Sequence, residues 1–119
     1  MFLPLISHFE QIGWEVHSTH RCEQWGRELM TPDECTRIDC NEIAKCDRFV
    51  AYPGLPASPG THVELGWAFA LQKDVTLLLK KGGEYAFLVQ GLKTITRVRT
   101  LFYGAVVAPQ ELEQLLVGA

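Results

Sequence analysis

The residues best placed to do chemistry are two carboxylates, Glu64 and Asp39. Glu64 lies near the start of an expected helix over 61–72, directly after the loop 54–60. Asp39 falls within the apolar face of an expected helix over 31–46, and a carboxylate on an inward face is costly unless it is paired or used. Carboxylates in such places can act as nucleophiles or exchange protons with a substrate.

Both carboxylates also have a purely structural interpretation. Thr61-x-x-Glu64 matches a capping box, and a negative charge there also suits the positive end of the helix dipole. Asp39 could instead lie at the rim of its helix face and form an outward salt bridge. Spacing alone therefore favours a capping role for Glu64 and leaves the two interpretations of Asp39 balanced.

A second group of polar side chains contains His17, His20 and Cys22. Zinc sites need four ligands, and no second close pair accompanies this segment, so we expect no metal site and predict that the histidines line a loop above a strand end. Lys80 and Lys81 follow an expected strand and favour a solvated turn over an anion site. Neither GxGxxG nor GxxxxGK[ST] occurs, so no dinucleotide or P-loop site is indicated.

The elements that must position these residues alternate along the chain. Apolar runs predict strands at 14–19, 48–53, 75–79 and 97–103. Helical spacing or capping signals predict helices at 2–12, 31–46, 61–72, 84–91 and 108–117. This alternation is typical of an α/β fold with a mostly parallel sheet, in which ligands bind beyond the carboxyl ends of the strands. That rule selects the loop 53–60 and the start of the next helix.

Length, net charge and cysteine content narrow the class of protein. The 119 residues fit a single domain over 1–119, and the net charge of −3 gives no support for a nucleic-acid surface. We find neither a signal peptide nor an apolar run of membrane-spanning length. The four cysteines form no CxxC pair. The sequence therefore predicts a reduced cytoplasmic protein that contacts neither nucleic acid nor a membrane.

The block from Asp39 to Leu79, "DCNEIAKCDRFVAYPGLPASPGTHVELGWAFALQKDVTLLL", resembles the nucleoside 2-deoxyribosyltransferase-like family. The matching features are Asp39, a second Asp eight residues later that opens an apolar strand, a loop, a G-T-x-x-E-x-G helix start and a closing apolar strand. The preceding "GWEVHSTH" resembles the family's second strand. The family's first strand has no counterpart before Met1.

The resemblance implies a flavodoxin-like or Rossmann-like three-layer sandwich, a homodimer or higher homo-oligomer, and chemistry at the N-glycosidic bond of a small-molecule nucleoside or nucleotide. It implies neither a metal nor an organic cofactor. By position, Glu64 would be the nucleophile at the anomeric carbon, and Asp39 the acid/base or sugar-positioning group. The expected substrate-binding residues are Ser58, Gly60, Thr61, His62 and His20.

Ser58 decides between the activities that the resemblance implies. The transferases of the family carry an acid six residues before the nucleophile, whereas the related deoxynucleoside 5′-monophosphate N-glycosidases carry a Ser that contacts the phosphate. A hydroxyl can donate to phosphate, whereas a carboxylate would repel it. We therefore expect hydrolysis of a nucleoside 5′-monophosphate, with 2′-deoxyribose favoured. A deoxyribosyltransferase that exchanges bases and a catalytically degenerate nucleotide-binding module are the alternatives.

Overall fold

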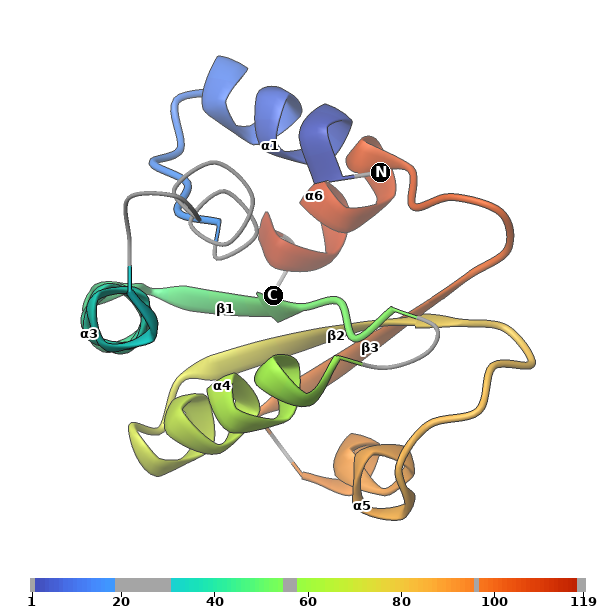
Figure 1. Ribbon diagram of the computed structural model, residues 1–119. Helices are drawn as coiled ribbons and strands as arrows, with labels where there is room; N and C mark the ends of the chain where they lie inside the picture. Colours follow the sequence, from blue (N-terminus) through green and yellow to red (C-terminus); the bar gives the residue numbers. More distant parts are fainter. Residues whose placement is uncertain (1, 19–30, 55–57, 96, 118–119) are drawn as a thin grey trace.

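A parallel three-stranded sheet forms the centre of the computed structural model, which describes residues 2–18, 31–54, 58–95 and 97–117 (Figure 1). The strands are β1 (Arg48–Ala51), β2 (Asp74–Lys80) and β3 (Val98–Tyr103), in the spatial order β1-β2-β3. Both pairings are parallel. Parallel neighbours cannot be joined by a hairpin, so the chain returns through helices between the strands.

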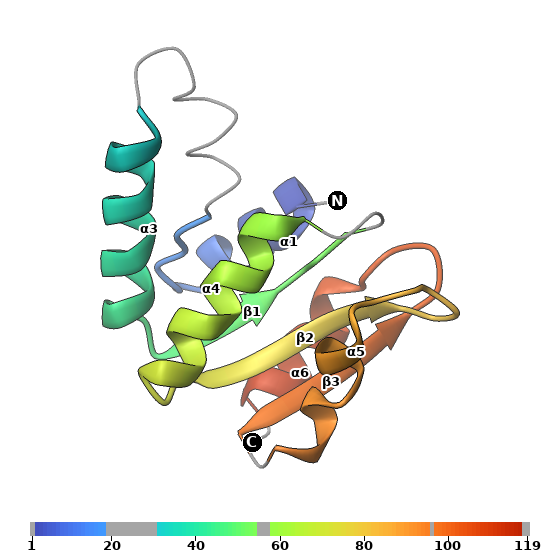
Figure 2. The ribbon, with the colours of Figure 1, turned by 60° about the horizontal axis from the view of Figure 1, so that its bottom comes forward.

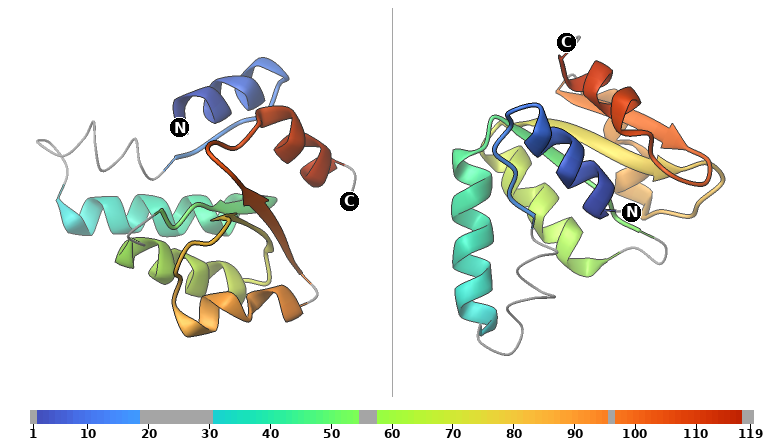
Figure 3. Two further views of the ribbon diagram at one scale, coloured as in Figure 1. Left: turned by 90° about the vertical axis from the view of Figure 1, so that its right-hand side faces the viewer. Right: turned by 90° about the horizontal axis from the view of Figure 1, so that it is seen from above.

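Helices cover both faces of the sheet. The described helices are α1 (Phe2–Gln11), α3 (Pro32–Lys45), α4 (Pro59–Ala70), α5 (Phe87–Gln90), the 3₁₀ helix η1 (Leu92–Thr94) and α6 (Pro109–Val117). Figures 2 and 3 show α1 and α6 together on one face, and α4 on the other with α3 beside it. The predicted α/β sandwich of three layers is therefore confirmed.

The central strand explains why the sheet is covered on both faces. All five residues from Val75 to Leu79 are buried, as the continuous apolar run predicts. Alternate side chains point to opposite faces, so Leu77 packs with Leu65 and Ala68 of α4, while Leu78 packs with Leu5 of α1. One hydrophobic core therefore lies on each side of the sheet.

Helix α3 has a defined start and a defined end. Thr31 is the N-cap, because its hydroxyl accepts a hydrogen bond from the Glu34 amide at 3.2 Å, and Pro32 occupies the first helical position. Both features match the sequence prediction. At the other end, the Lys73 ammonium donates to the carbonyls of Ala44 and Cys46 at 2.8 and 3.0 Å. This cation complements the negative end of the helix dipole.

The predicted strand over 14–19 does not form in its described part, residues 14–18. The segment lines the same cleft as β1 instead of pairing with it, and it pairs with no other described strand. Strand pairing needs two backbones about 5 Å apart with ladder hydrogen bonds between them, and residues 14–18 form no ladder with a described strand. The apolar residues Trp14 and Val16 still pack against the core that α1 and α6 share. The apolar pattern therefore reflects burial without a strand ladder.

The predicted helix over 84–91 is also shorter in the structure, where α5 has four residues and η1 follows. Phe87 and Leu88 are 87% and 81% exposed, so the apolar pattern of this segment does not translate into a buried face. None of the described helices is both long enough and apolar enough to cross a membrane.

Candidate active site

A cleft of about 1140 Å³ opens beside β1. Its walls come from the segment 13–18, from β1 and the residues that follow it, and from the start of α4. The cleft therefore includes the carboxyl end of a parallel strand, where ligands bind in α/β folds. Three residues selected from the sequence line it together: Ser58, Thr61 and Glu64. Its volume is ample for a small-molecule substrate.

Glu64 is not a helix cap. Helix α4 begins at Pro59 with Ser58 as its N-cap, so its first turn contains no acidic residue and Glu64 falls in the second turn. The capping-box prediction for Thr61 and Glu64 is therefore wrong. Its physical reason is the proline, whose fixed φ angle suits the first helical position and moves the helix start forward. Glu64 is half-buried on the cleft wall.

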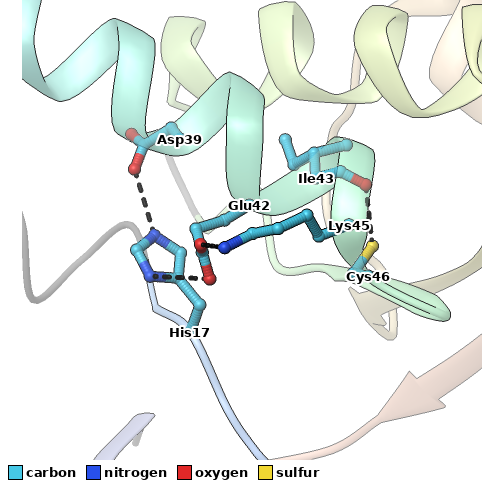
Figure 4. Close-up of polar contacts among 6 residues, drawn as sticks. All are labelled: His17, Asp39, Glu42, Ile43, Lys45 and Cys46. Carbon is cyan, nitrogen blue, oxygen red and sulfur yellow. Dashed lines mark hydrogen bonds and ion pairs between the residues drawn. The ribbon is translucent and has the colours of Figure 1, made fainter.

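Asp39 is buried, with 7% of its surface exposed, although it belongs to the polar sequence of α3. Its Oδ1 atom lies 3.2 Å from Nε2 of His17, which sits on the extended segment 14–18 (Figure 4). The predicted inward position of Asp39 is thus confirmed, and its partner is a histidine. His17 lines the cleft, whereas Asp39 lies behind it.

Glu42 stands one helical turn after Asp39 and faces the same imidazole. Its Oε1 atom is 3.8 Å from Nδ1 of His17, and its Oε2 atom accepts a hydrogen bond from Lys45 at 2.6 Å (Figure 4). The hydrogen bond from Lys45 lowers the pKa of Glu42, and the same contact raises the pKa of Lys45. Both groups therefore keep their charges near neutral pH, and Glu42 presents an anion at the cleft wall.

Two predicted substrate-binding residues, Gly60 and His62, are not on the cleft. Gly60 lies at the exposed start of α4. The ring of His62 turns back along the helix, where Nδ1 donates to the carbonyl of Ser58 at 2.9 Å. His20 lies outside the described residues. The cleft therefore contains Ser58 and Thr61 from the predicted binding set.

Sequence reasoning underrated two of the cleft residues, His17 and Glu42. A sequence signal existed for both, because Glu42 shares the apolar arc of α3 with Asp39, and His17 precedes the loop above the sheet. Spacing within one helix could not reveal that a histidine from a separate segment lies between the two carboxylates. Only the packing of residues 14–18 against α3 shows this.

The cysteines of the described residues are free thiols at Cys35, Cys40 and Cys46. Cys46 lines the cleft and donates to the carbonyl of Ile43 at 3.1 Å. Burial raises the pKa of the Cys46 thiol, so it stays protonated at neutral pH and is a poor nucleophile. In the part of the chain that the structure describes, no three His, Cys, Asp or Glu side chains gather closely enough to hold a metal ion.

Comparison with known proteins finds no matching protein-family model and no matching curated protein. Solved structures, however, are similar to the chain. The Clostridium botulinum CMP N-glycosidase BcmB is 39% identical, with a TM-score of 0.74, over 99% of this chain and 87% of that one.

The solution structure of BlsM is 55% identical, with a TM-score of 0.73, over 86% of this chain. This chain spans 64% of the length of BlsM. An identity of 39% over most of both chains is well above what a shared fold alone requires. The sequence block from Asp39 to Leu79, the cleft beside β1 and the similarity to BcmB agree: the chain belongs to the nucleoside 2-deoxyribosyltransferase-like family, in the group that includes nucleotide N-glycosidases.

Proposed function

We propose that the protein hydrolyses the N-glycosidic bond of a nucleoside 5′-monophosphate, with Glu64 as the nucleophile. The observation that carries this proposal is the placement of Glu64, Ser58 and Thr61 on one cleft in a chain 39% identical to a CMP N-glycosidase. Because that relative is described for CMP, both CMP and its 2′-deoxy counterpart are substrates to test. The single domain over 1–119 and a homodimer or higher assembly belong to the same proposal.

In the first step, a carboxylate oxygen of Glu64 attacks the anomeric carbon of the sugar. The bond from that carbon to the base nitrogen breaks, and its electron pair stays with the base, which takes up a proton. Asp39 is assigned to this step as the acid/base or sugar-positioning group, and its contact with His17 links its carboxylate to the cleft. The transition state resembles an oxocarbenium ion, which a carboxylate on one face of the sugar stabilises.

In the second step, water attacks the same carbon and displaces Glu64. The water gives up a proton, and the sugar 5-phosphate leaves with a hydroxyl on the anomeric carbon. Dividing the reaction through a covalent intermediate replaces one difficult step by two easier ones. A second base in place of water would turn the same chemistry into transfer.

Ser58 and Thr61 supply the proposed contacts to the phosphate or the sugar. Ser58 is exposed at the N-terminal end of α4, where the positive end of the helix dipole favours an anion. The Ser58 hydroxyl can donate to a phosphate oxygen, and no acidic residue lies in the first turn of α4 to repel it. These features favour a nucleotide over a free nucleoside.

The first prediction concerns Glu64. We expect Glu64→Ala to lower the rate of free-base release from 5′-monophosphates by about 10³-fold or more, because loss of a nucleophile removes the covalent route. Chromatographic detection of free base from a panel of nucleotides measures the effect. Circular dichroism checks that the variant is folded.

The same assay separates the rival functions. Unchanged release by a folded Glu64→Ala protein would refute the assignment of the nucleophile. An added acceptor base that becomes a new nucleoside would indicate a transferase. Calorimetric binding of nucleotides without turnover would indicate a nucleotide-binding module.

A further inference from the structure

His17 is the side chain that joins the two carboxylates of α3 at the cleft. Its Nε2 atom lies 3.2 Å from Asp39, and its Nδ1 atom lies 3.8 Å from Glu42 (Figure 4). The three side chains come from two elements, the extended segment 14–18 and helix α3. His17 lines the cleft and 31% of its side chain is exposed, whereas the side chain of Asp39 is 9% exposed. The imidazole therefore lies between a buried carboxylate and the space that a substrate would fill.

The chemistry of the contacts sets their direction. Ionised carboxylates only accept hydrogen bonds, so Nε2 of His17 donates to Asp39, while Nδ1 faces Glu42 at ion-pair distance. Asp39 and Glu42 are three residues apart on one helix face, where like charges repel. A ring that presents its nitrogens to both carboxylates offsets this repulsion. Other charged side chains that line the same cleft include Lys45 on α3, Glu15 on the segment 14–18 and Glu64 on α4.

We propose that His17 is a positioning residue for Asp39, and this inference rests on the proposed N-glycosidase function. The imidazole holds the Asp39 carboxylate in one orientation behind the cleft wall. It also ties the segment 14–18 to α3, so that this part of the cleft wall is held in place. Fixing a reacting or substrate-orienting group in this way raises the rate of the chemical step more than the affinity for the substrate.

Nitrogen-15 spectra of the histidine rings test the geometry without reference to activity. We expect Asp39→Asn to shift chiefly the Nε2 signal of His17, and Glu42→Gln to shift chiefly the Nδ1 signal. His8 provides the internal reference, because its Nε2 atom pairs with Glu113 at 2.6 Å between α1 and α6, away from the cleft. Unmoved His17 signals in both variants would overturn the proposed bridge.

Kinetics of base release test the positioning role. We expect His17→Phe, which keeps a planar ring without N–H groups, to lower kcat by about 10–100-fold while KM changes less than about 3-fold. His17→Gln keeps one donor, so it should retain more activity than His17→Phe. His8→Gln removes the His8–Glu113 pair between α1 and α6 and should change kcat by less than about 2-fold.

The outcomes separate this inference from the proposed function. A wild-type protein that releases no base from any nucleotide refutes the function, while the nitrogen-15 spectra still decide the bridge. Active His17→Gln and His17→Phe proteins with wild-type kcat refute the positioning role and leave the function standing. If His17→Phe does not fold, His17→Gln carries the same decision through its kcat and KM.

Discussion

Glu64 shows how the role of one side chain depends on where its helix begins. Had α4 begun after Thr61, the carboxylate would have served the backbone amides of the first turn. Because Pro59 starts the helix earlier, Glu64 is carried into the second turn and onto the cleft wall. A displacement of two or three residues along a helix rotates a side chain by more than half a turn. The position of the helix start therefore decides whether Glu64 caps the helix or lines the cleft.

Ser58 provides a prediction at the residue scale that follows from the proposed phosphate contact. We expect Ser58→Asp to lower kcat/KM for a nucleoside 5′-monophosphate by about 10–100-fold, because a carboxylate replaces a donor beside the phosphate. Activity on the free nucleoside should not fall. Asp caps helices as well as Ser does, so the thermal midpoint should be unchanged and the charge alone is tested.

Parallel assays on a nucleotide and its free nucleoside measure kcat/KM for each substrate, and the ratio of the two values reports the effect of the phosphate. Ser58→Ala is the matched control, since it removes the hydroxyl without adding a charge and should have a smaller effect. An equal loss on both substrates would contradict the phosphate contact.

At the scale of elements, α3 is the support that carries Asp39 and Glu42. Its register against His17 depends on a start capped by Thr31 and an end held by Lys73, and hydrogen bonds of 2.8–3.2 Å fix both termini. The helix contacts α4, so the two helices that carry the candidate site residues are packed as neighbours (Figure 2). Disturbing one end of α3 would therefore move both carboxylates together.

Thr31→Ala is the corresponding test. Loss of the N-cap should lower the free energy of unfolding by about 1 kcal/mol, because the Glu34 amide loses its acceptor. The midpoint of thermal unfolding should fall by about 3–6 °C. Thr36→Ala, in the exposed middle of the same helix, should be neutral or slightly stabilising, since Ala is the better helix former. A loss of equal size in both variants would contradict the capping role.

The sequence predicted helices and strands more accurately where a local signal marked their ends. The capping box at Thr31 and the continuous apolar run from Val75 to Leu79 placed α3 and β2 within one residue or so of their observed bounds. Residues 14–18 show why other predictions were wrong, because an apolar strand-like pattern cannot reveal whether a partner strand lies beside it. The contact between His17 and Asp39 could not be predicted for the same reason, since it depends on packing between separate segments.

For the whole molecule, stability depends on two cores that share the single strand β2. Leu77 is fully buried between the sheet and α4, with 0% of its surface exposed. We expect Leu77→Ala to lower the free energy of unfolding by about 2–5 kcal/mol, through lost burial and the cavity that remains. That is a large part of the total stability of an ordinary domain.

Urea unfolding followed by circular dichroism measures this change. Val106→Ala removes apolar atoms from a side chain that is 67% exposed, so it should change the free energy by less than about 0.5 kcal/mol. A loss below about 1 kcal/mol for Leu77→Ala would mean that the core around β2 is not packed as described.

The parallel arrangement of the sheet also has a consequence for how the chain reaches its native state. Each pairing joins distant positions, as Arg48 with Asp74 and Val75 with Val98 illustrate. No hairpin can nucleate such a sheet, and the helix between two strands has to be accommodated before their backbones meet. The entropy of closing those long loops is lost before the sheet hydrogen bonds compensate for it. The protein should therefore fold more slowly than a helical bundle of its length, with β2 ordered only once both neighbours have arrived.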